Sequence, residues 1–209
     1  MSPTVAEDNM VEYEPFEEDG SLLMVAESLW RGFATELLEL HSLKGAQFIN
    51  QLKLIVSEGE FHPVKGENNI FSAISEQSDD FDNLMNAARK AVEHGYCVYI
   101  LPNPQGIRTA DFIFERKGIY KMYDLKTVRG QSSVFNRLLE SIGQTNNVLL
   151  NMTADYNVRQ LAKDIRRYFQ MNGEALEVLI FKGNRSLQVK RVSAESKDFI
   201  GKFIKAYHK

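Results

Sequence analysis

Two short stretches of the chain place acidic and basic side chains where they could act on a phosphate group. Residues 110–114 are Ala-Asp-Phe-Ile-Phe, and residues 123–127 are Tyr-Asp-Leu-Lys-Thr. Apolar, aromatic and β-branched residues dominate both stretches, which predicts two strands, and a Lys-Gly pair between them predicts a turn. Because side chains alternate along a strand, Asp124 and Lys126 share one face, and Asp111 can lie beside them if the strands pair. Two carboxylates and an ammonium suit a divalent metal, an attacking water and a phosphate.

These strands belong to a longer predicted order of elements, α-β-β-β-α-β. The other elements expected there are a helix capped near Ser78-Asp79-Asp80, a strand at 96–101, a helix from Ser132 or Ser133 to about Ile142, and a buried strand at 148–152. Three strands joined by short turns form a meander, and a fourth after a helical crossover can lie parallel to one of them. We therefore expect an α/β fold of the α+β type, with a mixed sheet and helices on its faces.

This order, with Asp111 on the second strand and Asp124-Leu125-Lys126 on the third, resembles the core of the PD-(D/E)XK nuclease superfamily. More narrowly, residues 95–152 resemble the C-terminal nuclease domains of contact-dependent growth-inhibition toxins, the CdiA-type tRNA nucleases. The matching sequences are Gly-Tyr-Cys-Val-Tyr-Ile-Leu-Pro-Asn-Pro, Thr-Ala-Asp-Phe-Ile-Phe, Tyr-Asp-Leu-Lys-Thr, and a Gln shortly before Val-Leu-Leu. The resemblance covers about a third of the chain.

The resemblance implies that Asp111 and Asp124 bind a divalent metal, Mg²⁺ or Mn²⁺. It implies that Lys126 orients or activates the attacking water, or stabilises charge on the phosphate, and that Gln144 helps to order the substrate or the active site. The implied substrate is RNA, with tRNA as the first candidate, or DNA, and an immunity or inhibitor protein is an implied partner. The acidic residue that related nucleases often carry on the preceding helix has no clear match. Candidates for it are Asp82, Glu76 and Glu67.

Several basic or hydroxyl side chains could bind the nucleic acid. They are Arg129, Ser132, Arg137, Arg166 and Arg167. Backbone amides at the start of a helix, together with a nearby arginine, can hold a phosphate. Later arginines could follow the nucleic-acid backbone, with Tyr156 and Tyr168 stacking on bases. The alternatives are an ordinary capped loop and a helix whose basic face is simply solvated.

The remaining segments extend this core on both sides. Residues 1–21 are acidic and expected to be disordered, and residues 22–77 form a helical extension with a break near 41–45 and an irregular stretch at 59–77. Residues 78–209 form the nuclease-like domain. Its last part is an α-β-β-α addition, expected as a helix at 158–171, a hairpin of strands at 176–181 and 187–192, and a helix at 194–207.

Composition and charge narrow the function classes. The 209 residues are 44% hydrophobic and 25% charged, as in ordinary globular proteins, and no apolar run approaches the roughly 18 residues of a membrane span. Cys97 is the single cysteine, so no internal disulfide forms, which fits a reducing cytoplasm. Residues 159–209 contain 12 Lys or Arg and 5 Asp or Glu, a net charge of +7 that would attract a polyanion.

Three functions therefore remain open. The first is a metal-dependent nuclease at Asp111, Asp124 and Lys126. The second is a metal-independent, toxin-like ribonuclease that uses His, Arg and Lys, for which His62 or His94 could serve. The third is a non-catalytic module that binds nucleic acid or protein. The four histidines have no second ligand at zinc spacing, so a zinc site is not expected.

Overall fold

The computed structural model describes most of the chain from the second predicted helix onward. The described residues are 36, 39–40, 43–59, 61–74, 79–103, 108–130 and 133–209. The acidic segment 1–21 and most of the first predicted helix lie outside them. Among the described helices, none is long and apolar enough to cross a membrane.

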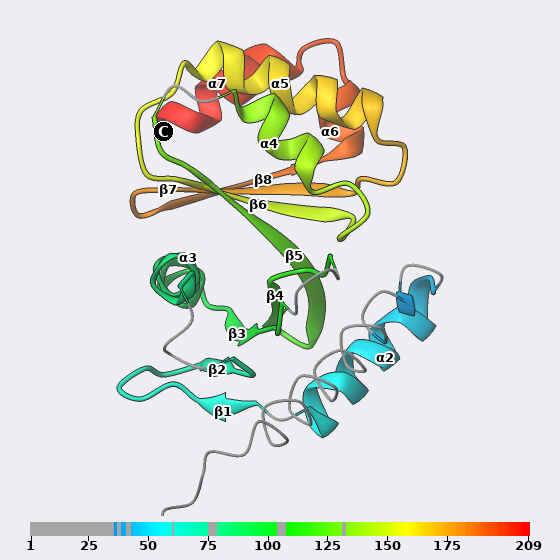
Figure 1. Ribbon diagram of the computed structural model, residues 1–209. Helices are drawn as coiled ribbons and strands as arrows, with labels where there is room; N and C mark the ends of the chain where they lie inside the picture. Colours follow the sequence, from blue (N-terminus) through cyan, green and yellow to red (C-terminus); the bar gives the residue numbers. More distant parts are fainter. Residues whose placement is uncertain are drawn as a thin grey trace, which may run out of the picture.

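The described part of the chain contains one eight-stranded mixed sheet, in which strands that follow one another along the chain are also neighbours (Figure 1). The strands are β1 (His62–Pro63), β2 (Ile70–Ser72), β3 (Cys97–Ile100), β4 (Phe112–Arg116), β5 (Ile119–Val128), β6 (Asn147–Met152), β7 (Glu177–Lys182) and β8 (Arg185–Lys190). The pairs β2–β3, β5–β6 and β6–β7 are parallel, and the other pairs are antiparallel. The predicted mixed α/β fold is confirmed.

The described helices are α2 (Gly45–Glu58), α3 (Phe81–Glu93), α4 (Val134–Glu140), α5 (Val158–Met171), α6 (Arg191–Glu195) and α7 (Phe199–His208). The order α3-β3-β4-β5-α4-β6 is the predicted core. The expected polar cap begins α4, where Ser133 accepts a hydrogen bond from the Asn136 amide. Helix α3 begins directly after Asp80, as expected, but Asp80 makes no side-chain capping hydrogen bond. The turn between β4 and β5 is also confirmed, with Lys117 and Gly118 both at positive φ.

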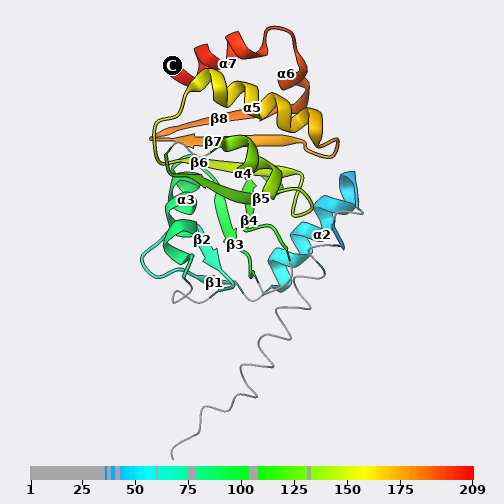
Figure 2. The ribbon, with the colours of Figure 1, turned by 45° about the horizontal axis from the view of Figure 1, so that its top comes forward.

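The helices cover the sheet on both faces (Figures 1 and 2). Alternate residues of β5 show which helix covers which face. Tyr123 and Leu125 pack in the cluster that contains α3. Met122 packs with α2, and Val128 packs with α4, α5 and α7. Helix α3 therefore lies on one face, while α2 and the group α4–α7 lie on the other.

Strand β5 connects the two halves of the sheet. Its residues 119–123 pair with β4, and its residues 124–128 pair with β6. The change of pairing partner falls at Asp124. On the same face of β5, Met122 packs against α2 and Val128 packs against α4 and α5. The side chains of Asp124 and Lys126 therefore emerge between two groups of helices.

Two sequence-based expectations were wrong. The stretch 59–77 is not irregular throughout, because β1 and β2 form within it and β2 pairs with β3. Strands this short show no periodicity, and their hydrogen-bond partners lie far along the chain. The last helix is two helices, α6 and α7, because Ser196 is extended. The Arg166 guanidinium donates to the carbonyls of Ala194 and Ser196, 3.0 and 2.7 Å away, and so stabilises the break. The division into residues 22–77 and 78–209 stays a prediction.

Candidate active site

Asp111 is held beside β5 by backbone hydrogen bonds on both of its sides. It lies directly before β4, where its amide donates to the Tyr123 carbonyl at 3.0 Å and its carbonyl accepts from the Leu101 amide at 2.9 Å. Its side-chain Oδ2 accepts a 2.6 Å hydrogen bond from the amide of Leu125. The carboxylate is therefore fixed against the residue that separates Asp124 from Lys126.

Asp124 and Lys126 face each other on β5, as the alternation of side chains predicts. The Lys126 ammonium lies 2.9 Å from Asp124 Oδ2, and the two side chains are 13% and 2% exposed. In the described part of the chain, no hydrogen bond of good geometry reaches this buried Oδ2. A carboxylate oxygen in this state is available to a cation.

The two carboxyl groups act on each other. Burial and, after it, the nearby Asp124 carboxylate raise the pKa of Asp111 to about 8. Burial also raises the pKa of Asp124, against the lowering effect of the Lys126 ammonium. Two neighbouring carboxylates repel each other when both are ionised. A bound cation stabilises both charged forms, so the ionised pair is more stable with a cation than without one.

Arg108 belongs to this region, although the sequence did not single it out. Its guanidinium donates to the Glu140 carbonyl at the end of α4, and its positive charge lowers the pKa of Asp124. Gln144, which was predicted, donates from Nε2 to the same carbonyl at 2.9 Å. Arg108 and Gln144 therefore meet at one carbonyl beside the carboxylates. The signal in the sequence was its position, since Arg108 is a basic residue three positions before Asp111.

Arg129 is not brought to this site. Its guanidinium donates to Asn83 Oδ1 at 3.1 Å, and Thr127 donates to the same oxygen at 2.7 Å. Asn83 lies on α3, which covers the face opposite to that of Asp124 and Lys126. Ser132, predicted to help hold a phosphate, lies outside the described residues, whereas the neighbouring Ser133 caps α4.

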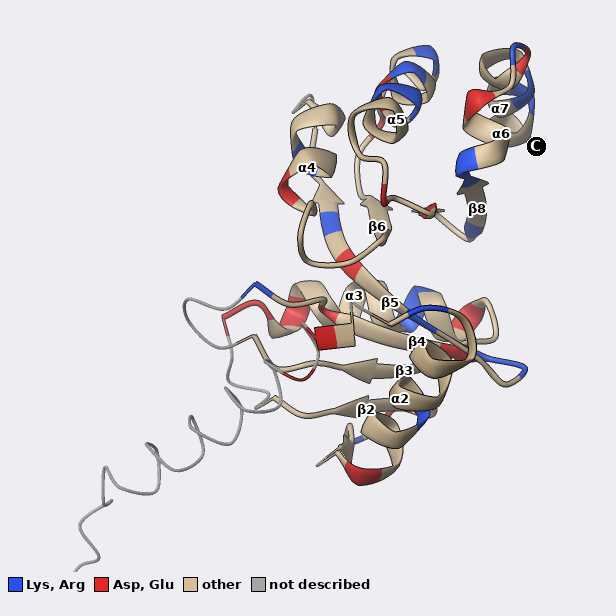
Figure 3. Cartoon of the chain, turned by 90° about the vertical axis from the view of Figure 1, so that its right-hand side faces the viewer, with Lys and Arg blue, Asp and Glu red and all other residues tan. Residues whose placement is uncertain are grey.

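The other predicted substrate-binding residues lie on helices α4 and α5. Arg137 forms an exposed ion pair with Glu140 at 3.6 Å. Arg167 stacks over the Phe135 ring, 4.1 Å from its centre, and Arg166 is used in the contact with Ala194 and Ser196 described above. Tyr168 is fully buried and cannot stack on a base, which corrects the prediction made for it. Lys and Arg residues nevertheless gather on α5, α7 and β8 (Figure 3).

The residues present fit a hard divalent cation held by two protein carboxylates. In the described part of the chain, no third His, Cys, Asp or Glu joins Asp111 and Asp124. Of the three candidates for a third acid, Glu67 pairs with Arg89 at 2.7 Å, Asp82 is exposed on α3, and Glu76 lies outside the described residues. Mg²⁺ is commonly held by one or two carboxylates together with water and substrate phosphates, so two suffice.

These features define a mixed α/β protein with paired carboxylates and a lysine at the centre of its sheet. Its structure is similar to a chain of the CdiA-CT/CdiI toxin and immunity complex from Burkholderia pseudomallei, with a TM-score of 0.37, 15% identity, and coverage of 56% of this chain and 92% of that chain. A similarity at this level carries no argument about function. No protein-family model and no curated protein matches the chain.

Proposed function

We propose that the chain is a metal-dependent nuclease that hydrolyses phosphodiester bonds at Asp111, Asp124 and Lys126. The supporting observation is the meeting of two mutually repelling carboxylates and one ammonium where β5 changes its pairing partner. The proposed substrate is RNA, with tRNA first, or DNA, and the proposed metal is Mg²⁺ or Mn²⁺. An immunity or inhibitor partner remains a prediction of the sequence resemblance.

Each side chain has a role in this proposal. Asp111 and Asp124 would hold the cation, which when bound lowers the pKa of water and neutralises charge on the phosphate. The amide of Leu125 keeps the Asp111 carboxylate oriented. Lys126, held by Asp124, donates to the attacking water or to a phosphoryl oxygen, where fixed positive charge stabilises the transition state. Arg108 provides a second positive charge at the exposed side of the carboxylates.

The purified protein should cut RNA or DNA when Mg²⁺ or Mn²⁺ is present and stop when EDTA is added. Cleavage is followed on labelled tRNA, unstructured RNA and single- and double-stranded DNA, and the ends of the products are identified. Full activity in EDTA with 2′,3′-cyclic phosphate ends would instead support the metal-independent ribonuclease. Binding of nucleic acid without cleavage under any metal condition would support the non-catalytic module.

Replacement of Arg108 by alanine should lower kcat about 10-fold and change KM less, because a fixed charge beside the reacting phosphate acts mainly in the transition state. Steady-state cleavage of a short labelled oligonucleotide measures both constants. Arg89→Ala is a matched control, since Arg89 is an exposed arginine on α3, on the other face of the sheet. An unchanged kcat in Arg108→Ala, or an equal loss in Arg89→Ala, would remove Arg108 from the site.

A further inference from the structure

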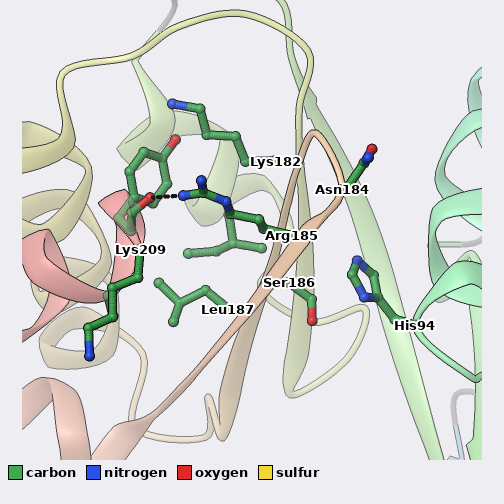
Figure 4. Close-up of a pocket in the computed structure, with 10 residues that line it drawn as sticks. His94, Lys182, Asn184, Arg185, Ser186, Leu187 and Lys209 are labelled. Atoms are coloured by element: carbon green, nitrogen blue, oxygen red, sulfur yellow. Dashed lines mark hydrogen bonds between the residues drawn. The ribbon is translucent and has the colours of Figure 1, made fainter.

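A cavity with basic lining residues lies apart from the candidate active site. Its volume is about 320 Å³, and it opens between the β7–β8 hairpin and α7 (Figure 4). Figure 4 shows Lys182, Arg185 and Lys209 on the side of the hairpin that faces α7, with His94 on the other side. Ile180 and Leu187 add apolar lining. The cavity is therefore a hollow with positively charged walls and a partly apolar lining.

The charged side chains that line this cavity are all positive. Its lining residues include Lys182, Arg185 and Lys209 and no Asp or Glu, and the adjoining hollow of about 460 Å³ adds His208. Lys182 lies 3.5 Å from the carboxylate of Asp155, which is fully exposed, so solvent weakens that pair. The Arg185 guanidinium donates to the Tyr207 carbonyl over a long 3.5 Å. Because the positive charges of Lys182 and Arg185 are held close together, the binding of an anion between them is favourable.

Tyr207 places a buried hydroxyl in the wall of the cavity, close to the Lys182 ammonium. Its side chain lines the cavity, the residue is 5% exposed, and within the described ranges no hydrogen bond of good geometry reaches its hydroxyl. The nearby Lys182 ammonium can only donate, so it provides no acceptor for the hydroxyl proton. The Lys182 ammonium lies over its ring, 4.5 Å from the centre. Because a buried hydroxyl whose proton has no acceptor costs free energy, an acceptor oxygen beside Lys182 would satisfy it.

The sheet register relates this cavity to the candidate active site. Lys182 aligns with Met152 and through it with Val128, two residues beyond Lys126 on β5. Ile180 aligns with Lys126 through Leu150, and it packs in the same cluster as Val128. Lys182 is two residues after Ile180 on β7, so its side chain is on the same face of the sheet as Lys126. Two strand spacings and two residues separate the sites by roughly 12 Å along the sheet. Helices α4–α7 cover this face between the two sites, so this separation is a lower limit for the path of a nucleic-acid strand between them.

We propose that this cavity binds a backbone phosphate of the nucleic acid, at a position away from the bond that is cut. The inference rests on the proposed function for its substrate class. Lys182 and Arg185 supply charge-assisted hydrogen bonds to the phosphate oxygens, and the Tyr207 hydroxyl donates a further bond. The apolar lining limits the water that competes for these groups. The cavity thus binds a part of the substrate that is distant from the bond that is cut.

The test is binding of a fluorescein-labelled single-stranded RNA of about 12 nucleotides in EDTA, where cleavage is stopped. The double variant Lys182→Gln with Arg185→Gln should raise Kd about 10-fold at low salt and lower the slope of log Kd against log salt by about 0.7, since loss of one single-strand phosphate contact removes about 0.7. Tyr207→Phe should raise Kd about 3-fold. Anisotropy gives both quantities, and thermal melting verifies that each variant is folded.

The matched control is Lys53→Gln with Lys65→Gln, which removes two exposed lysines from α2 and from the segment between β1 and β2. An equal loss of binding in this control, an unchanged Kd in the cavity variant, or no binding by the wild-type protein would overturn the inference. Cleavage of bis(p-nitrophenyl) phosphate with Mn²⁺ separates this result from the proposed function. That small diester does not reach the cavity, so the cavity variant should cut it at the wild-type rate. Absence of this cleavage in the wild-type protein counts against the nuclease alone.

Discussion

Nucleic-acid cleavage by Asp124→Asn is expected to be about 1,000-fold slower than cleavage by the wild-type protein, or slower still. The substitution keeps the size of the side chain and removes both the metal-binding charge and the partner of Lys126. Loss of a single preorganised charge in an active site costs on the order of 100- to 1,000-fold in rate, and this change affects two such groups. Single-turnover cleavage at saturating Mn²⁺ measures the chemical step.

Lys126→Ala should be about 100-fold slower under the same conditions, because the ammonium is lost while both carboxylates remain. Asp79→Asn, at an exposed aspartate just before α3, is the control and should keep the wild-type rate. Circular dichroism and melting temperature confirm that the variants are folded. Cleavage by Asp124→Asn at more than a tenth of the wild-type rate would rule out the assigned site.

Without metal, the protein should lose stability as the pH rises from about 4 to about 8, and Asp111→Asn should remove much of this loss. The pKa of the Asp111 carboxyl is about 8 in the folded protein, against an ordinary value of 3.8. Folding therefore strengthens proton binding, so the protonated group stabilises the fold fully below about pH 4. That contribution disappears as the pH passes about 8.

At pH 8.5 in EDTA, the melting temperature of Asp111→Asn should exceed that of the wild-type protein by about 5 °C, and at pH 4.5 the two should agree. Mn²⁺ added at pH 8.5 should raise the wild-type melting temperature, since about 100 times the Kd stabilises a protein by about 2.7 kcal/mol. It should leave Asp111→Asn nearly unchanged. Parallel pH profiles for the two proteins would show that the Asp111 carboxyl is not perturbed.

The sequence predicted those features that short-range physics determines. The alternation along residues 123–127 placed Asp124 and Lys126 on one face, and the Lys117-Gly118 turn brought β4 against β5. Helix α5 has the predicted bounds, because the apolar spacing and the Asn-Gly pair at its end agree. The Ser133 cap of α4 and the Lys117-Gly118 turn needed no information from distant residues.

The features that were missed depend on distant residues. Strand β2 is too short to show a pattern and forms because β3 offers it a parallel edge. The positive charge of Arg166 suggested a contact with nucleic acid, but its guanidinium donates its hydrogen bonds to the carbonyls of Ala194 and Ser196, at the break between α6 and α7. Arg108 lies near Asp124 because Glu140, 32 residues later, accepts its hydrogen bond. In each case, the partner that decides the role of the residue is absent from its local sequence.

The double pairing of β5 makes the complete site a product of the whole sheet. Asp111 comes from the half that contains β3 and β4, whereas Asp124 and Lys126 lie on the stretch that pairs with β6. A folding intermediate with one half formed would hold only part of the catalytic set. Under the proposed function, hydrolytic competence therefore requires both halves of the sheet to be paired with β5, and it is lost when either half opens.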